Sequence, residues 1–238
     1  MLSLSFAGII FLVAGFVQGL TGFGSALVAI PLLSFLFDIK TSVPLCMLNG
    51  VLLTTYLACS LYRYFDVKKI LPLLIGALPG ILIGVSVLKN IDGAFIRFGI
   101  GVLIIGYSLY NLRVKPQPLN PGTKWGYIAG FMTGAIGGAF SAGGPPAIIY
   151  TTLTSWKKEE IKATLTGFFV VNGYITALAH ALMGITTMAT VHIFAFTAPF
   201  VLIGTWLGAK ISGRINRATY LKVVYYVLLV MGIMMFVN

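Results

Sequence analysis

Two long uncharged stretches limit this chain to one class of fold. Residues 1–37 contain no Asp, Glu, Lys or Arg, and neither do residues 163–209. A helix of about 20 apolar residues spans the hydrocarbon core of a bilayer, and only helices or closed barrels satisfy their backbone groups there. Since 58% of all residues are hydrophobic and 9% are charged, the sequence predicts an all-α integral membrane protein surrounded by the lipid bilayer.

The two halves of the sequence resemble each other. Residues 15–31 align with residues 130–146 at a constant offset, which predicts two related modules. A chance alignment of glycines and apolar residues is the alternative, and it stays open at this level. The matched residues are Gly15, Phe16, Gly19, Gly22 and Pro31, which align with Gly130, Phe131, Gly134, Gly137 and Pro146.

The predicted modules are a first transmembrane repeat at residues 1–112 and a second at 125–238. A polar linker at 113–124, which carries three prolines, joins them. Each repeat is expected to contain a broken or re-entrant helical hairpin followed by three transmembrane helices.

The break in each repeat follows from helix length. One helix over residues 1–37 would be roughly 55 Å long at 1.5 Å per residue, nearly twice the hydrocarbon thickness of about 30 Å. We therefore predict a break at 19–24 with a returning piece from about Ser25 to Phe37, and an equivalent break at 137–146. The predicted full spans are near 43–62, 70–88 and 94–112 in the first repeat and near 161–182, 188–209 and 218–236 in the second.

Loop charge predicts the orientation of the repeats. If each break returns the chain to the side it came from, the 16 Lys and Arg residues divide three to thirteen, whereas eight plain spans divide them ten to six. Because Lys and Arg concentrate on the cytoplasmic side, the first arrangement is favoured. It makes the two repeats inverted, the linker cytoplasmic and both termini extracytoplasmic. The net charge of +11 then reflects topology, and no nucleic-acid partner is expected.

Paired breaks inside the membrane predict a substrate site. Irregular backbone persists in hydrocarbon only where it is buried or lines a cavity, and broken helices at matching positions of inverted repeats mark the sites of secondary transporters. The N-terminal amides of a helix carry a partial charge of about +0.5 and attract anions. No charged residue lies in the middle of a predicted span, so we expect neutral donors at the breaks to hold a small anion.

The candidate binding residues lie at or near the two breaks. Each polar one could instead bond to a neighbouring helix or to its own backbone. The candidates are Gln18, Thr21, Gly22, Gly24, Ser25, Asn49, Ser141, Gly143, Gly144, Pro145 and Asn172, with Thr166 as a further donor.

Several other residues have a structural interpretation. Cys46 and Cys59 are roughly 20 Å apart on one predicted helix, too far for a disulfide, and both are expected to pack as small apolar residues. His180 and His192 lie toward the ends of their helices and are expected to be structural, although either could take up a proton if transport is proton-coupled. No metal site and no cofactor are expected. Glycines expected to let helices approach closely are Gly76, Gly80, Gly84, Gly99 and Gly101.

At its two breaks the sequence resembles the sulfite exporter TauE/SafE family of membrane permeases. The resemblance rests on "GFVQGLTGFGSALVAIPLL" near the N-terminus and on "GFMTGAIGGAFSAGGPPAIIY" followed by "KKEEIKATLTGFF" in the second half. It implies a multi-pass transporter of the prokaryotic inner membrane. The implied substrates are small anions of the sulfite, thiosulfate and organosulfonate class, such as sulfoacetate. Many family members look richer in glycine at the first motif, so the first break is the weaker match.

Three functions are compatible with the sequence. Alternating access around the paired breaks is preferred, with protons as a candidate coupling ion and either a monomer or a homodimer as the assembly. A passive anion channel would use the same chemistry. A rhomboid-like intramembrane serine protease would need Ser141 as nucleophile and His180 as base. The repeat argues against that enzyme, because Ser25 occupies the matching break and the first half contains no histidine, so no enzymatic activity is expected.

Overall fold

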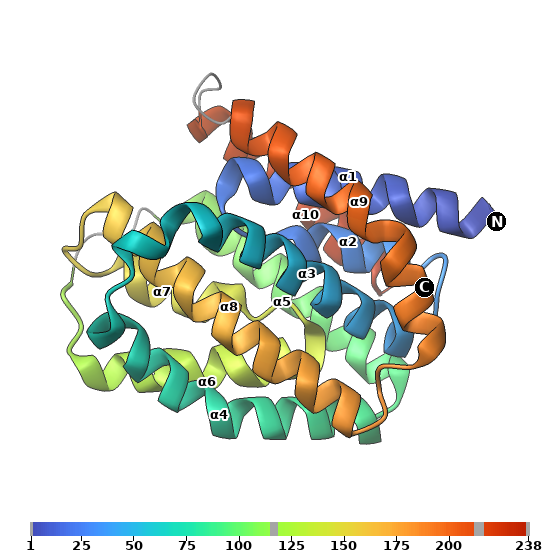
Figure 1. Ribbon diagram of the computed structural model, residues 1–238, viewed down its shortest axis with the longest axis horizontal. Coiled ribbons are helices and arrows are strands. Elements are labelled where there is room, and N and C mark those ends of the chain that lie inside the picture. The colour runs from blue at the N-terminus through green and yellow to red at the C-terminus, as the bar shows by residue number, and fades with distance from the viewer. Residues whose placement is uncertain (1, 115–118, 212–216, 237–238) are drawn as a thin grey trace. The chain divides into compact units, whose positions relative to one another are not determined.

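The computed structural model describes residues 2–114, 119–211 and 217–236, and these residues form helices with no strand (Figure 1). Residues 115–118 of the predicted linker lie outside the described part. The helices of the first half are α1 (Leu2–Thr21), α2 (Ser25–Leu33), α3 (Ile39–Leu61), the 3-10 helix η1 (Tyr62–Tyr64), α4 (Val67–Asn90) and α5 (Gly93–Arg113). Those of the second half are α6 (Thr123–Phe140), α7 (Gly144–Thr152), α8 (Lys158–Leu182), α9 (Met188–Ile211) and α10 (Arg217–Met234).

The order of helices confirms the predicted all-α membrane fold. Each half begins with a long helix, continues with a helix of nine residues and ends with three long helices. Every predicted full span coincides with one of these long helices. Six helices in the described part are long and apolar enough to cross a membrane, namely α1, α3, α4, α5, α8 and α9. The chain is therefore a multi-pass membrane protein.

Both helix breaks occur inside the predicted segments, but each is shorter than predicted. The first is the three-residue turn 22–24, in which Gly22 and Gly24 have φ of +88° and +97°. This left-handed backbone conformation costs an L-residue about 1–2 kcal/mol and costs glycine almost nothing. The two glycines therefore allow α1 to end here. The second is the turn 141–143, which begins with Ser141 at φ +53°. The returning helix α2 ends at Leu33, earlier than Phe37.

The structure divides into two compact units, and each unit draws on both halves of the sequence. Unit 1 comprises residues 1–49, 91–115 and 187–238, and unit 2 comprises residues 50–90 and 116–186. Helix α4 of the first half thus packs in unit 2, and α9 of the second half packs in unit 1.

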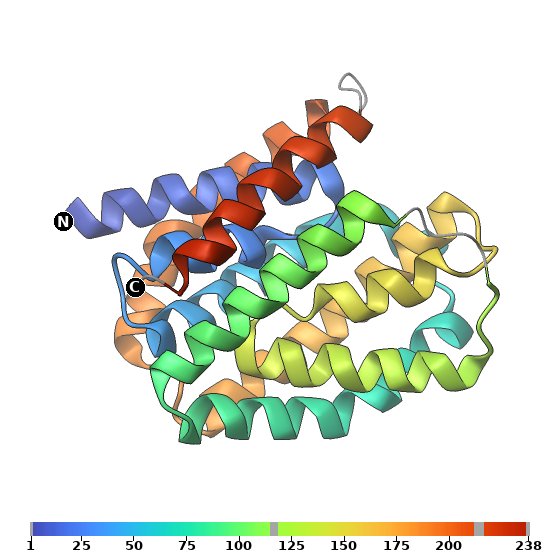
Figure 2. The same cartoon turned by 180° about the vertical axis from the view of Figure 1, so that it is seen from behind.

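Unit 1 is built on two helix pairs. Helix α1 packs along α9, and α10 lies beside α5 (Figure 2). The α1–α9 contact depends on glycine, because a Cβ at Gly19 would lie 2.8 Å from Ala209 N, and one at Gly208 would lie 3.0 Å from Leu20 N. Small residues on both helices therefore let their backbones meet, as is common in membranes.

Unit 2 has the same kind of contact between α4 and α6, which run side by side (Figure 1). A Cβ at Gly76, Gly80 or Gly84 would collide with backbone atoms of α6, and a Cβ at Gly130 or Gly134 would collide with α4. The packing role predicted for the glycines of α4 is thus confirmed, and α6 is held close to α4 along its length.

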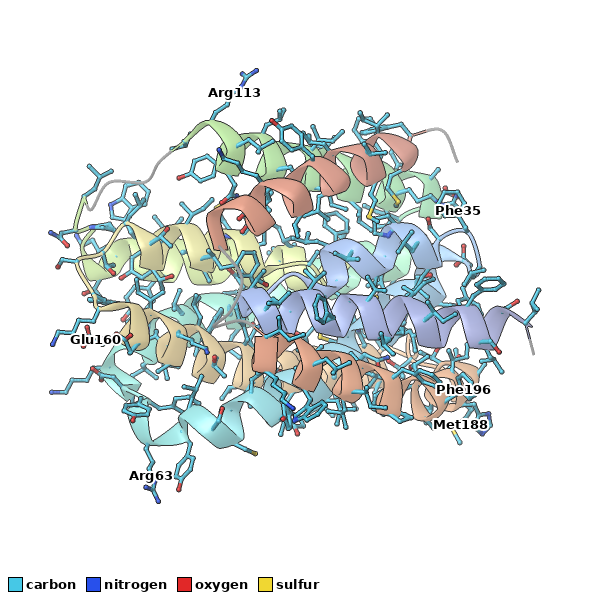
Figure 3. All side chains as sticks on the ribbon, turned by 90° about the horizontal axis from the view of Figure 1, so that it is seen from above. Phe35, Arg63, Arg113, Glu160, Met188 and Phe196 are labelled. Carbon is cyan, nitrogen blue, oxygen red and sulfur yellow. The ribbon has the colours of Figure 1, made fainter. Side chains whose placement is uncertain are left out.

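Helices α7 and α8 cover the apolar core of unit 2. That core contains Leu73, Ile81, Ala147 and Phe168, all of which are almost completely buried. At one end of the unit, where Arg63 and Glu160 are labelled in Figure 3, Lys69 Nζ forms an ion pair of 2.7 Å with Glu160 Oε1. This ion pair joins the start of α4 to the start of α8.

The two cysteines are unpaired, as predicted, but they differ in burial. Cys46 is buried, whereas Cys59 is exposed. The expectation that both pack internally was therefore wrong for Cys59, which lies on the face of α3 that its neighbours leave uncovered.

Candidate functional site

The polar side chains at the first break bond to the break itself. Gln18 Oε1 accepts a hydrogen bond of 3.0 Å from Ser25 N, the first amide of α2. Thr21 Oγ1 bonds to Val17 O at 2.8 Å and to Phe23 O at 2.6 Å, and it lies 3.2 Å from Phe23 N. Gln18 and Thr21 therefore shape the turn, and Gln18 occupies one of the amides that an anion would need.

Two amides of α2 remain available in its first turn. Helix geometry leaves the first N–H groups without partners inside the helix, and here Ser25 N is capped by Gln18. The amides of Ala26 and Leu27 are the next two in that turn. The first break thus offers backbone donors, while its side chains are largely used within the turn.

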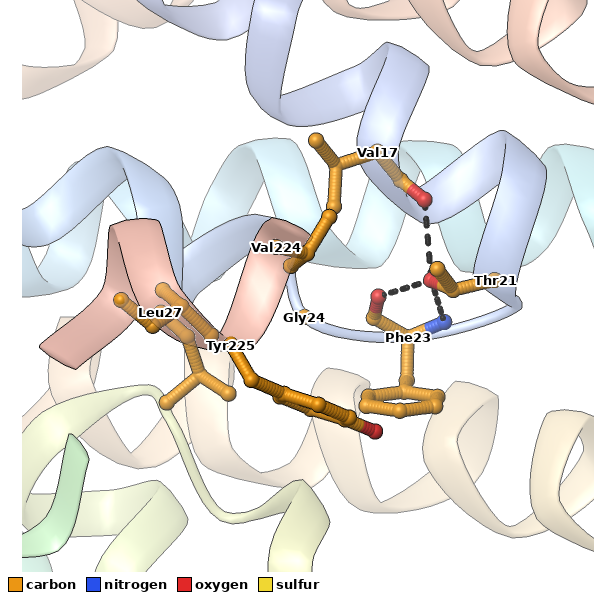
Figure 4. A pocket seen from close by; sticks show the side chains of 8 residues that line it. Val17, Thr21, Phe23, Gly24, Leu27, Val224 and Tyr225 are labelled. Atoms are coloured by element: carbon orange, nitrogen blue, oxygen red, sulfur yellow. Dashed lines mark hydrogen bonds between the residues drawn. The ribbon is translucent and has the colours of Figure 1, made fainter. Parts of the chain in front are cut away.

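A small apolar pocket lies against the first break within unit 1 (Figure 4). The ring of Phe23 also meets the ring of Tyr107 edge to face, at a centroid distance of 6.2 Å. The pocket is lined by Val17, Thr21, Phe23, Gly24 and Leu27 from the α1–α2 hairpin and by Val224, Tyr225 and Leu228 from α10.

Asn49 bonds to α9 and not to the first break. Its Nδ2 donates to Leu45 O at 3.1 Å and to Thr197 Oγ1 at 3.0 Å, and the side chain is buried. Its amide therefore joins α3 to α9 inside unit 1. Thr166, the further candidate, donates to Lys162 O on its own helix at 2.8 Å.

The second break is tightly packed at Gly143. A Cβ on Gly143 would lie 2.7 Å from Gly137 N and would collide with Thr133 O, so only glycine fits. A Cβ on Gly144 would meet nothing closer than Ile148 Cδ1 at 3.4 Å. Of the two glycines, Gly143 is required by packing, whereas a Cβ on Gly144 would make only ordinary van der Waals contacts.

The first turn of α7 offers few free amide donors, although the first N–H groups of a helix normally lack partners within it. Pro145 and Pro146 have no N–H group, and Ala147 N donates to Thr133 Oγ1 at 3.1 Å. Gly144 N is then the one amide of this turn that is neither absent nor bonded to Thr133. An anion at α7 would consequently need further donors from outside the helix.

Asn172 of α8 is the side chain that could supply such a donor. It is 6% exposed, and its Oδ1 is buried without a hydrogen-bond partner. A Cβ built on Gly137 would lie 3.8 Å from Asn172 Nδ2 and 4.0 Å from Gly143 N. Two nitrogen atoms from different elements, Asn172 Nδ2 and Gly143 N, therefore lie next to Gly137.

His180 of α8 bonds to the end of α6 that precedes the second break. Its Nε2 lies 2.8 Å from Gly138 O, and its Nδ1 is buried without a hydrogen-bond partner. The nitrogen that this bond leaves free, Nδ1, therefore does not bond to Ser141. The structure gives no support to a Ser141–His180 catalytic pair.

Comparison with protein-family models assigns the chain to a family. The family model for the sulfite exporter TauE/SafE matches residues 7–235. The chain belongs to the sulfite exporter TauE/SafE family. This confirms the resemblance read from the two break motifs, and it makes the protein a member of a membrane transporter family.

Two curated relatives align along most of their length. The chain is 27% identical over 223 residues to the probable sulfite/organosulfonate exporter TauE of Cupriavidus necator, covering 90% of this chain and 86% of the relative. It is 26% identical over 253 residues to the probable membrane transporter protein YunE of Bacillus subtilis, covering 91% and 90%. No solved structure matches the chain.

The fold thus gathers the predicted residues into separate clusters. Gln18, Thr21, Gly22, Gly24 and Ser25 form the first break, and Ser141, Gly143, Gly144 and Pro145 form the second with Asn172 beside it. Sequence reasoning missed Gly137 and Thr133, which face the second break from α6. Gly137 had a signal, since it aligns with Gly22, whereas Thr133 had none.

Proposed function

We propose that this TauE/SafE protein carries small anions across the membrane, and that the second break supplies their main contacts. Sulfur oxyanions and organosulfonates are the proposed substrates, and the Cupriavidus relative, a probable sulfite/organosulfonate exporter, supports that class. The observation that carries the proposed site is the pair of nitrogen donors, Asn172 Nδ2 and Gly143 N, beside Gly137.

Neutral donors suit this substrate. The side-chain amide of Asn172 can donate through Nδ2, which lies 3.8 Å from the Cβ position of Gly137, whereas its buried Oδ1 only accepts hydrogen bonds and does not help to hold an anion. Gly144 N and the partial positive charge of the α7 N-terminus add to the attraction for an anion. Ser141, at the start of the turn, places its hydroxyl next to these amides in the chain.

The transport cycle is proposed to be alternating access. The two sequence repeats are taken as inverted, with residues 1–112 and 125–238 as the modules and both breaks contributing to substrate binding. The linker 113–124 is then cytoplasmic, and both termini are extracytoplasmic. Labelling of single cysteines introduced at Leu119 and at Ser3 in intact cells tests this orientation. External labelling at residue 119 contradicts it.

The binding site is tested by Gly137→Ala. The added methyl makes only ordinary contacts of 3.8 Å or more with Asn172 Nδ2 and Gly143, so the protein should fold. The methyl occupies the space from which an oxygen would reach both donors, and we expect binding at least about tenfold weaker, since one lost polar contact commonly costs 1–3 kcal/mol. Isothermal titration of the purified protein with sulfite, thiosulfate, sulfoacetate and taurine measures this.

The matched control is Gly106→Ala, because a Cβ on Gly106 meets nothing within 4 Å. This variant should bind as tightly as the unmodified protein. Asn172→Leu, which removes both polar atoms at similar volume, should lose binding as Gly137→Ala does. Unchanged affinity in both Gly137→Ala and Asn172→Leu rules out the proposed site.

A passive channel is distinguished by counterflow. Proteoliposomes loaded with unlabelled sulfoacetate should transiently accumulate labelled sulfoacetate if a carrier exchanges one molecule for another. A channel only equilibrates the label, so absence of the transient would favour the channel.

A further inference from the structure

A buried histidine at the second break has no assigned role. His180 is 0% exposed, and its Nε2 lies 2.8 Å from Gly138 O. A carbonyl oxygen can only accept a hydrogen bond, so Nε2 must carry the hydrogen. Nδ1 then holds a free lone pair, and it has no hydrogen-bond partner among the described residues.

The hydrogen bond of His180 is made to the C-terminal end of α6. Helix α6 ends at Phe140, so the carbonyl of Gly138 belongs to the last turn, whose oxygens lack helical partners. The C-terminus of a helix carries a partial negative charge, which stabilises a cationic histidine. His180 therefore caps the helix that leads into the break, and the partial negative charge of this helix end offsets part of the cost of placing a buried positive charge there.

No other ionisable group bonds to the imidazole. Burial and the Gly138 carbonyl are what act on its ring nitrogens, and no charged side chain does so among the described residues. The ionisable side chains on the elements that pack against α8 are Tyr56 and Cys59 on the C-terminal part of α3, Tyr62, Arg63 and Tyr64 on η1, Lys68, Lys69 and Lys89 on α4, Lys124 and Tyr127 on α6, and Tyr150 on α7. Those described on α8 itself are Glu159, Glu160, Lys162 and Tyr174.

We propose that His180 binds a proton at Nδ1 and that this proton is carried together with the anion held at the second break. The inference rests on the proposed anion site. Asn172 and His180 are eight positions apart on α8, roughly 12 Å at 1.5 Å per residue. The proton comes from a hydronium ion of the bulk solution, which is left as water; it forms an N–H bond with the Nδ1 lone pair and makes the imidazolium, so no other reactant is needed.

The two ligands should strengthen each other. Opposite charges roughly 12 Å apart, at the effective dielectric constant of about 20 that suits protein sites, change binding on the order of tenfold. Coupling between two sites is reciprocal. Anion binding should therefore raise the pH at which His180 titrates by about one unit, and His180 protonation should tighten anion binding by about tenfold.

The proton site can be observed directly, because the chain contains two histidines. His192→Gln leaves His180 as the one histidine, and its ring nitrogens can be followed by NMR after isotope labelling. We expect the signal to titrate with pH and the midpoint to rise when sulfoacetate is added. A signal that does not titrate, or whose midpoint does not respond to sulfoacetate, overturns the inference.

A second variant separates proton binding from the structural cap. His180→Gln keeps an N–H group that can donate to Gly138 O, but it does not titrate. In proteoliposomes with the membrane potential held at zero, the unmodified protein should concentrate sulfoacetate on the alkaline side about tenfold per pH unit for one proton per anion. His180→Gln should still exchange sulfoacetate but should no longer concentrate it.

The results of these experiments distinguish the proton role of His180 from the anion site at the second break. Accumulation by His180→Gln equal to that of the unmodified protein overturns the proton role and leaves anion transport intact. Loss of all exchange in His180→Gln, with the fold retained, assigns His180 to positioning the break and also overturns the proton role. Unchanged sulfoacetate affinity in Gly137→Ala and Asn172→Leu instead removes the proposed anion site.

Discussion

The close contact between α4 and α6 predicts that Gly80→Ala destabilises the protein, and the structure allows the size of this effect to be worked out. A Cβ on Gly80 would collide with Phe131 O and would lie 2.8 Å from Ala135 N. Both neighbours are backbone atoms, so they cannot turn aside as a flexible side chain would. The variant Gly80→Ala must therefore push α6 away from α4 or distort one of the two helices.

The net cost can be worked out from two opposing effects. Overpacking of this kind costs about 1–3 kcal/mol, and alanine regains about 1 kcal/mol over glycine inside a helix. Gly106→Ala gains the helix effect without the collision, because nothing lies within 4 Å of its Cβ. Gly80→Ala should thus be less stable than Gly106→Ala by about 1–3 kcal/mol.

Thermal unfolding of the detergent-solubilised variants measures this difference. For a chain of this size, 1 kcal/mol moves the midpoint by about 2–4 °C, so Gly80→Ala should unfold roughly 2–12 °C below Gly106→Ala. Equal midpoints for the two variants would refute the close approach of α4 and α6. They would also remove the reason for expecting α6 to hold the second break rigidly.

Three further comparisons test the second break and the role of Asn49. Ser141→Gly should be about 1 kcal/mol more stable than Ser141→Ala, because both lose the hydroxyl and only alanine pays for the positive φ; equal midpoints in thermal unfolding would contradict this. Gly143→Ala should lower the yield of monodisperse protein in size-exclusion chromatography, whereas Gly144→Ala should not, because only the first adds a Cβ in collision with α6. Asn49→Leu should lower the unfolding midpoint through loss of its bond to Thr197 and leave sulfoacetate affinity unchanged; weaker binding would place Asn49 in the site.

Local features of the sequence were enough to predict the helices. These features are the spans of apolar residues, the excess length of residues 1–37 and the glycines at 22 and 24. Each is local in the sequence, so it can be recognised without knowing the tertiary structure. The presence of the short helices α2 and α7 follows from the same signals, but the end of α2 at Leu33 does not. The break at Ser141 was found through the glycines and prolines around it, although Ser141 itself adopts the left-handed backbone.

The sequence by itself therefore determined the membrane class, the positions of the helices and the two breaks. The tertiary structure alone decided which polar groups remain available to a ligand. Gln18 Oε1 accepts a hydrogen bond from Ser25 N, Asn49 bonds to Thr197, and Asn172 Nδ2 lies with Gly143 N beside Gly137. Hydrogen bonds between residues distant in sequence depend on which helices pack together. That packing results from contacts along the whole chain, so no local sequence pattern predicts it.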